Sequence, residues 1–358
     1  NGDWKIIADQ PAGTGDSPVP ACLGQPQDDN PTPATAMIRT LGTSANGPTA
    51  LHLSEAYRSS ELASESFALI AKSLGECSVR GSYISSARTI TGIGDQATAI
   101  LLTDPQKNSR RAVIANRTGQ VVNVIDIAET RYAPDLDKAA AALAQLTDQQ
   151  CTLAIGVCAS NPQVSDGPPP VGGDEPGFLA LADIPVPTSG AGTWGGLAPS
   201  SPAGIVTSGC EDVSFTTLNA SSRAARSYVL TDKPKGVPDT FGIDQIALTM
   251  RSARAAQDEE RTIARNIKRC GVRSPTAQVR DYATVSGTGA DRTAITGSVA
   301  LVSQQITPET TSTYRVGIAA AGDKLVYTFL PRTKAWDLTP GEWSTLTVRA
   351  AQRATQVR

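Results

Sequence analysis

The stretch 56-AYRSSELASESFALIAKSLGECSVRG-81 decides the fold, because 249-TMRSARAAQDEERTIARNIKRCGVRS-274 aligns with it without a gap. When the two are anchored on Cys77 and Cys270, both carry Arg-Ser near the start and finish in Cys-x-Val-Arg. Most shared positions are apolar and recur at helical spacing. We therefore predict one amphipathic helix in each half of the chain.

The segments on both sides of these helices also agree. Upstream, 4-WKIIADQP-11 is similar to 178-FLALADIP-185. Downstream, each half reads as two strands around a glycine turn, followed by a helix. We predict the hairpins at 110–127 and 313–330, around Gly119 and Gly322, and the final helices at 135–150 and 340–356. The chain is therefore interpreted as a tandem duplication of whole domains.

The repeat sets the expected domains and fold class. We predict a first domain at 1–159, a Pro/Gly-rich linker at 160–176 and a second domain at 177–358. Strands follow one another without intervening helices, which favours antiparallel sheets. The prediction is an α+β protein of two tandem homologous domains, each an antiparallel sheet with helices packed on one face.

Length and charge exclude some classes of protein. A chain of 358 residues is long enough for two ordinary domains. A net charge of −2 gives no electrostatic footprint for nucleic acid. No apolar run approaches the ~18–20 residues of a membrane span. Because the chain starts at Asn1 without Met, we expect a mature form or a soluble fragment of a longer protein.

Six widely spaced cysteines favour disulfides and an oxidising compartment. The duplication makes Cys22–Cys77 equivalent to Cys210–Cys270. The remaining two, Cys151 and Cys158, most simply bond each other. One histidine and no CxxC pair make a metal site a weak reading, and we expect no metal and no cofactor.

The Ala-Asp-x-Pro segment, the helix that ends in cysteine, the 92-GIGD-95 turn and the hairpin form a recurring pattern. It resembles the extracytoplasmic sensor-like domains of actinobacteria, the PknH-type Ser/Thr kinase sensor domain family. The resemblance implies an antiparallel sheet with helices on one side, intramolecular disulfides and a cleft proposed to bind a ligand. The tandem copy and the extra Cys151/Cys158 pair depart from the family pattern.

Four arginines are the candidate ligand-binding residues, because they recur at matching places in both halves. Arginine forks suit carboxylate or phosphate groups, so each could line a cleft for an anionic ligand. The alternative is that each bridges its helix to the sheet by a salt bridge. The four are Arg58, Arg80, Arg251 and Arg273.

Nothing marks a catalytic constellation. His52 is the only histidine, and its duplicate position is Gln245, so the repeat preserves no imidazole there. We place His52 at the start of a helix, as a polar surface residue. A nucleophile needs a positioned base, and none is indicated. The fragment is expected to be no enzyme, which leaves room for a cytoplasmic catalytic or DNA-binding domain outside it.

The leading hypothesis is a non-catalytic sensor or ligand-binding region outside the cytoplasm, in the cell envelope or secreted. It would belong to a membrane-anchored actinobacterial signalling protein, linked to a kinase or sigma factor, with its anchor outside the fragment. Its expected partner is a small envelope-derived ligand or an envelope protein, not nucleic acid. The alternative is a free-standing secreted lipoprotein that binds or carries an apolar envelope ligand.

Overall fold

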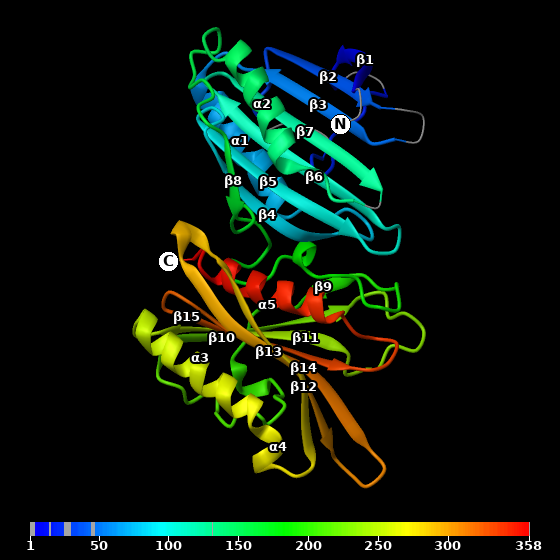
Figure 1. Cartoon of the computed structure of the whole chain (residues 1–358), viewed down its shortest axis with the longest axis vertical. Coiled ribbons are helices and arrows are strands. Elements are labelled where there is room, and N and C mark those ends of the chain that lie inside the picture. Colours follow the sequence, from blue (N-terminus) through cyan, green and yellow to red (C-terminus); the bar gives the residue numbers. More distant parts are fainter. Residues whose placement is uncertain (1–3, 14–15, 25–29, 44–46, 131, 358) are drawn as a thin grey trace. The chain divides into compact units, whose positions relative to one another are not determined.

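The computed structural model describes residues 4–13, 16–24, 30–43, 47–130 and 132–357 (Figure 1). The chain divides into two compact units, Asn1–Gly172 and Gly173–Arg358. Each unit holds its own antiparallel sheet with helices, so the architecture is α+β and mostly antiparallel β.

The first unit is built on a sheet that has, within the described residues, the order β1-β2-β3-β7-β6-β5-β4-β8. Helix α1 (Ser60–Gly75) follows β3, and α2 (Leu136–Gln150) follows β7. The strands are β1 (Lys5–Pro11), β2 (Thr35–Gly42), β3 (Thr49–Ala56), β4 (Tyr83–Thr91), β5 (Gln96–Asp104), β6 (Ser109–Thr118), β7 (Val121–Thr130) and β8 (Gln163–Asp166).

The second unit has a sheet of order β12-β13-β14-β15-β11-β10-β9. Its strands are β9 (Trp194–Gly196), β10 (Ala220–Leu230), β11 (Gly242–Met250), β12 (Ala277–Thr288), β13 (Ala294–Gln305), β14 (Thr311–Ala321) and β15 (Lys324–Arg332). Its helices are α3 (Ala253–Lys268), the short α4 (Cys270–Arg273) and α5 (Pro340–Ala354), with 3-10 turns η1 (Leu181–Asp183), η2 (Pro202–Gly204) and η3 (Ala290–Arg292).

The two sheets share their strand order over seven strands. β1-β2-β3-β7-β6-β5-β4 in the first unit corresponds to β9-β10-β11-β15-β14-β13-β12 in the second. A long helix follows the third of these strands in each unit, and another follows the last hairpin. The pairing registers agree as well. The same cross-strand row reads Arg39–His52–Ile125 in one unit and Arg226–Gln245–Thr328 in the other.

The predicted helices and hairpins form for local reasons. Ser59 and Ser252 cap α1 and α3, each accepting a hydrogen bond from a backbone amide of the first turn. The hairpin β6–β7 turns at Gly119, whose φ is 52°. A Cβ there would lie 1.9 Å from the Ala154 carbonyl oxygen, so this turn requires glycine. Its counterpart at Gly322 also has a positive φ.

Helices cover both faces of the first sheet, which corrects the prediction of one covered face. Ala112 and Ile114 of β6 pack in one core with α2. The alternate residues Val113 and Ala115 are also fully buried, and they point to the other face, which α1 packs against. Figure 1 shows α2 in front of this sheet and α1 behind it. Such a continuous apolar run needs cover on both sides.

The second unit repeats this three-layer arrangement. Ile263 of α3 belongs to a core with Val316 and Ile318 of β14. Trp343 of α5 belongs to a different core, which contains Val326 of β15. The sequence analysis predicted two layers, because the apolar spacing of a helix shows which of its own faces is buried but not which side of the sheet it covers.

All three predicted disulfides form. Cys22–Cys77 and Cys210–Cys270 each join a segment before the long helix to the residues after it. The third bond joins Cys151 to Cys158 just beyond α2. Three disulfides fit a protein of an oxidising, extracytoplasmic environment.

The segment 160–176, predicted as a linker, is mostly part of the first unit. It contains β8, which pairs with the sheet strand β4, and the division between the units falls at Gly172. Gly92 contributes to this docking, because its carbonyl accepts the Ser160 amide at 2.8 Å. A short polar strand at a sheet edge has no apolar periodicity, so a prediction from composition alone assigned this segment as a linker.

The two similar segments 4–11 and 178–185 do not take equivalent structures, contrary to the predicted repeat. The first is the exposed edge strand β1. The second is irregular with one 3-10 turn, and Leu179 and Ile184 within it are buried. The reason lies in α5, where Arg353 binds Asp183 with Nε at 2.8 Å and Nη2 at 3.1 Å. Helix α2 contains no arginine, so Asp9 finds no such anchor.

Candidate functional site

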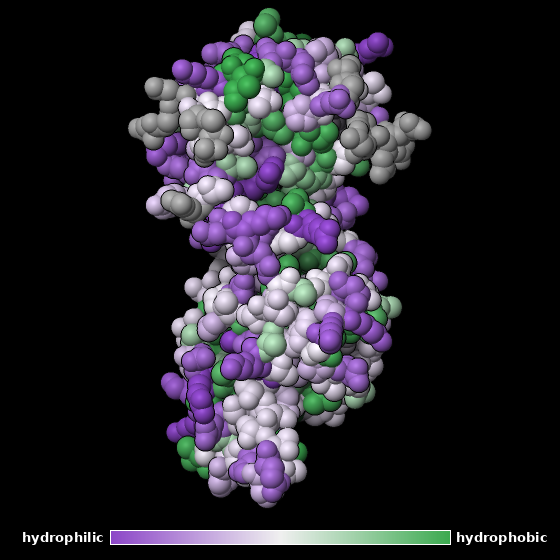
Figure 2. Space-filling model, turned by 90° about the vertical axis from the view of Figure 1, so that its right-hand side faces the viewer, coloured by the Kyte–Doolittle hydropathy of each residue, from purple (hydrophilic) through white to green (hydrophobic). Residues whose placement is uncertain are grey.

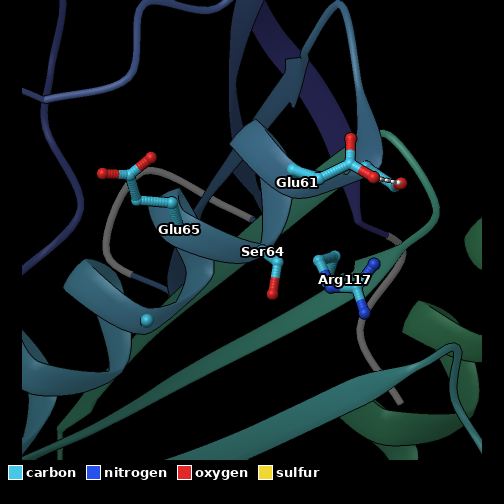
Figure 3. Close-up of a pocket in the computed structure, with 6 residues that line it drawn as sticks. Glu61, Ser64, Glu65 and Arg117 are labelled. Carbon is cyan, nitrogen blue, oxygen red and sulfur yellow. Dashed lines mark hydrogen bonds between the residues drawn. The ribbon is translucent and has the colours of Figure 1, made fainter.

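A shallow pocket of about 560 Å³ lies over the first turns of α1. Arg117 of β6 is its one cation, and Figure 3 shows Glu65 turned away from it. The guanidinium is already used: Nε donates to Gln96 at 2.8 Å and Nη1 to the Gly119 carbonyl at 3.0 Å. The lining is otherwise small or acidic, so the pocket suits no anion. It is lined by Ser60, Glu61, Ser64, Glu65, Ala68 and Arg117.

The structure does not bring the four predicted arginines together in clefts. Arg58 and Arg80 lie at opposite ends of α1, and a helix of 16 residues is about 24 Å long. Arg251 lies just before α3, and Arg273 is the last residue of α4, so these two are also separated by the length of α3. All four are exposed. Arg273 donates to the Cys210 carbonyl at 2.7 Å, which is a structural contact at the disulfide. Their role in binding stays a prediction.

A different arginine lies on one face of the first sheet, on the strand next to its edge. On the α2 side of the first sheet, β7, β3, β2 and β1 contribute one cross-strand row, namely Ile125, His52, Arg39 and Asp9. We call this row, together with Leu41 and Ile6 beside it, the Arg39 face. The side chain of Arg39 is 39% exposed, and among the described residues its only ion pair is with Asp9 at 3.4 Å. This cation is accessible and weakly engaged.

His52 lies on β3 and is buried, which corrects its predicted place at the exposed start of a helix. Its Nε2 lies 3.2 Å from Oδ1 of Asn123. Because an amide oxygen only accepts, Nε2 carries the proton, and in the neutral ring Nδ1 is an acceptor. Burial is the main cause that lowers the pKa of His52, so the ring is neutral at neutral pH.

A buried polar network fixes this imidazole from the α2 side. The side-chain amide of Asn123 donates to Oε1 of Gln150 at 2.9 Å, and Gln150 donates to Ser54 at 3.3 Å. Asn116 donates to Thr147 of α2 at 2.9 Å. The ring of His52 therefore has a fixed orientation. Nδ1 has no hydrogen-bond partner among the described residues.

The corresponding row of the second unit is filled by the chain itself. Arg226, the register equivalent of Arg39, has only 1% of its side chain exposed. It binds Asp174 through two hydrogen bonds, Nη1–Oδ1 at 2.9 Å and Nη2–Oδ2 at 2.5 Å. Such a bidentate pair is stronger and more directional than a single contact. Nε of Arg226 also donates to the Leu197 carbonyl at 3.0 Å.

Gln245 and Tyr228, beside Arg226, bind the backbone of the residues that follow Asp174. Gln245, the equivalent of His52, accepts the Leu179 amide on Oε1 at 3.0 Å and donates to the Gly177 carbonyl at 3.4 Å. The hydroxyl of Tyr228 donates to the Leu179 carbonyl at 2.9 Å. The second unit therefore binds its own irregular segment 174–179 on this face. We call Arg226 and Gln245, together with Tyr228 two residues further along β10, the Arg226 face.

Buried apolar side chains lie beside the Arg226 face in the second unit, whereas apolar side chains near the Arg39 face in the first unit are exposed. Leu179 and Trp194 join the α5 core, with Phe241 and Trp336 beside them. In the first unit Ile6 and Ile7 of β1 are exposed, at 61% and 66%. Figure 2 shows the side of the molecule that carries β1, and apolar side chains gather there on the first unit.

Sequence reasoning missed Arg39 because the loops between the paired strands differ in length. The loop 43–48 joins β2 to β3, whereas 231–241 joins β10 to β11. A gapless comparison therefore never aligns Arg39 with Arg226. The signal that could have found them is register: both arginines lie opposite the His52/Gln245 position that the repeat had identified.

One further group has metal-ligand chemistry. The carboxylate of Asp148 lies close to Cys151 and Cys158. Both sulfurs are in a disulfide, so they offer no thiolate to a metal.

Comparison with protein-family models, curated proteins and solved structures found no match to this chain. Among the described helices, none is both long and apolar enough to cross a membrane.

Proposed function

We propose that this chain is a non-catalytic binding region that works outside the cytoplasm, and that the Arg39 face of the first unit is its ligand site. One observation carries the proposal. The equivalent face of the second unit is occupied by residues 174–179 of the chain itself, whereas Arg39 is accessible. Among the described residues, register-equivalent arginines are thus covered in the second unit and accessible in the first.

We further propose that the units are tandem copies of the actinobacterial sensor-like domain. The shared strand order, the shared register and the equivalent disulfides support a duplication. The absence of catalysis is supported by His52, which bonds an amide and is fixed in a structural network. A general base would instead be expected to face a nucleophile or substrate.

In this proposal the chain is the sensing part of a membrane-anchored signalling protein. Ligand binding on the first unit would bias a kinase or sigma-factor domain across the membrane. The disulfides support the extracytoplasmic placement.

A second candidate is a secreted lipoprotein that carries an apolar envelope ligand. The exposed side chains of Ile6 and Ile7 beside the site favour it. The two candidates differ in what the site should accept, because a carrier would bind lipid without using Arg39.

Hydrogen exchange measured by mass spectrometry tests the proposed site. The chain is incubated separately with peptide, glycan and lipid fractions of the cell envelope. We expect at least one fraction to slow exchange in β2 and β3 and to leave β10 and β11 unchanged. Protection confined to the ends of α1 and α3 would instead support Arg58 and Arg251. No protection with any fraction would refute the binding function.

A further inference from the structure

We infer that the Arg39 face binds a short, turn-containing peptide segment of a partner protein, with an acidic side chain on Arg39 and a backbone amide on His52. This inference rests on the proposed function and names its ligand class. The second unit supplies the template, because its own segment makes the same contacts on the register-equivalent residues.

The template fixes the order of groups along the ligand. The carboxylate of Asp174 comes first and lies on Arg226. The carbonyl of Gly177 and the amide of Leu179 follow on Gln245. The ligand is therefore an acidic residue followed, some three to five positions later, by a small residue and a buried apolar one. Phe178, Leu179 and Ala180 are all buried in the template.

The first unit can supply the carboxylate contact and the amide-accepting contact with its own residues, but not the donor contact that Gln245 makes to the Gly177 carbonyl, because the one N–H of His52 bonds Asn123. Arg39 replaces Arg226 as the carboxylate fork. His52 replaces Gln245, because its Nδ1 can accept a backbone amide as Oε1 of Gln245 does. Leu41 stands at the position of Tyr228, so one hydroxyl contact is exchanged for apolar contact. These three residues lie on neighbouring strands of one face.

Asp9 is the internal competitor for this site. It lies directly opposite Arg39 in the sheet register and makes a single contact at 3.4 Å. A ligand carboxylate that binds both Nη groups would replace this weaker contact with a stronger one. The ligand would replace the Asp9 carboxylate on Arg39 with another carboxylate, which is the group that an acidic peptide side chain carries. A phosphate headgroup would add a second negative charge next to Asp9.

The apolar part of the ligand also has a place. Ile6 lies opposite Leu41 in the register of β1 and β2, on the same face. In the second unit the aromatic residues Trp194 and Phe241 cover the corresponding region. The apolar residues of the ligand would cover Leu41 and Ile6 in the first unit, where Ile6 is 61% exposed.

The test uses the full chain and a fluorescein-labelled peptide with the sequence of residues 173–184, GDEPGFLALADI. Fluorescence anisotropy gives its Kd. We expect Arg39→Ala to weaken binding by about 10- to 100-fold, since a charge-assisted fork is lost. Asp9→Asn should tighten it. Arg254→Ala is the matched control, which removes one exposed arginine of the second unit and should leave the Kd unchanged.

A second control acts on the peptide. Replacing its aspartate at the position of Asp174 by asparagine should weaken binding to the unaltered chain. The same replacement should have little further effect on Arg39→Ala, because the two groups act as a pair. Circular dichroism confirms that each variant is folded.

Two results overturn the inference. Binding that is equally strong in Arg39→Ala, or with the asparagine peptide, would show that the fork is not used. Failure of the peptide to bind, while a glycan or lipid fraction protects β2 and β3 from exchange, would refute the peptide ligand and leave the proposed site standing. Failure of every fraction and of the peptide would refute both.

Discussion

Arg39 and Arg226 occupy the same register position in their sheets, opposite His52 and Gln245, but their side chains are 39% and 1% exposed. The difference arises from what each arginine binds. Arg226 holds Asp174 by two hydrogen bonds under its own chain, whereas Arg39 has one long contact with an edge strand. The same position of the fold thus holds a covered arginine in the second unit and an accessible one in the first.

The aligned pair Asp9 and Asp183 should differ sharply in their effect on stability. Asp183 is buried and bound by Arg353, so Asp183→Asn leaves an uncompensated buried charge and should cost about 3–5 kcal/mol. Asp9→Asn breaks an exposed pair and should cost under about 1 kcal/mol. Urea denaturation measures both. Equal losses would show that the two segments are equivalent after all.

His52 should make the first unit sensitive to acid. Its pKa is lowered by burial, so between about pH 6.5 and its folded pKa the unfolded chain binds more protons. The free energy of unfolding therefore has its full value above about pH 6.5. It falls as the pH drops through that window, by at most about 1.4 kcal/mol per pH unit.

The variant His52→Gln, which copies Gln245, should remove this pH dependence. Denaturant titrations of both chains at several pH values between 4 and 8, a range set by the ordinary pKa of about 6.5, give the comparison. A difference between the chains that does not change with pH would contradict the assignment of a buried neutral imidazole.

Asp174 should keep the Arg226 face closed. Asp174→Asn weakens a bidentate charged contact, so the amide of Leu179 should exchange about 10- to 100-fold faster. Glu175→Gln removes the same charge one residue later and has no recorded hydrogen bond to Arg226, so it should change the rate little. Amide exchange followed by NMR distinguishes them, and equal rates in the two variants would argue against the fork as the latch.

The stabilisation from each of the three disulfides should grow with the logarithm of the length of the loop that it closes. Cys22–Cys77 spans 55 residues and Cys210–Cys270 spans 60, which corresponds to about 4 kcal/mol each. Cys151–Cys158 spans 7 residues and should contribute about 2 kcal/mol. Double Cys→Ser variants compared by thermal melting check this order, and a larger loss from the short loop would contradict it.

Local and repeated features of this fold could be predicted from the sequence. The helices at α1 and α3 follow from apolar spacing, and the hairpins from glycine turns at Gly119 and Gly322. The disulfides follow from matching cysteine positions in two copies. Each of these depends on residues that are close in sequence or aligned without gaps.

The rest depended on contacts that sequence spacing does not encode. The side of the sheet that each helix covers is set by packing of β6 and β14 on both faces. The buried, irregular conformation of segment 178–185 depends on Arg353, which binds Asp183 and is distant in the sequence. Arg39 became visible as a candidate only when the strand register placed it opposite His52.

The most direct test of the central claim is modification of the folded chain by phenylglyoxal, an arginine-specific reagent, read by mass spectrometry at Arg39 and Arg226. The account predicts rapid modification of Arg39, at a rate near that of the exposed Arg58, and protection of Arg226 until Asp174→Asn loosens its cover. If Arg226 were modified as fast as Arg39, or Arg39 were protected in the free chain, the two faces would not be the closed and accessible forms of one site.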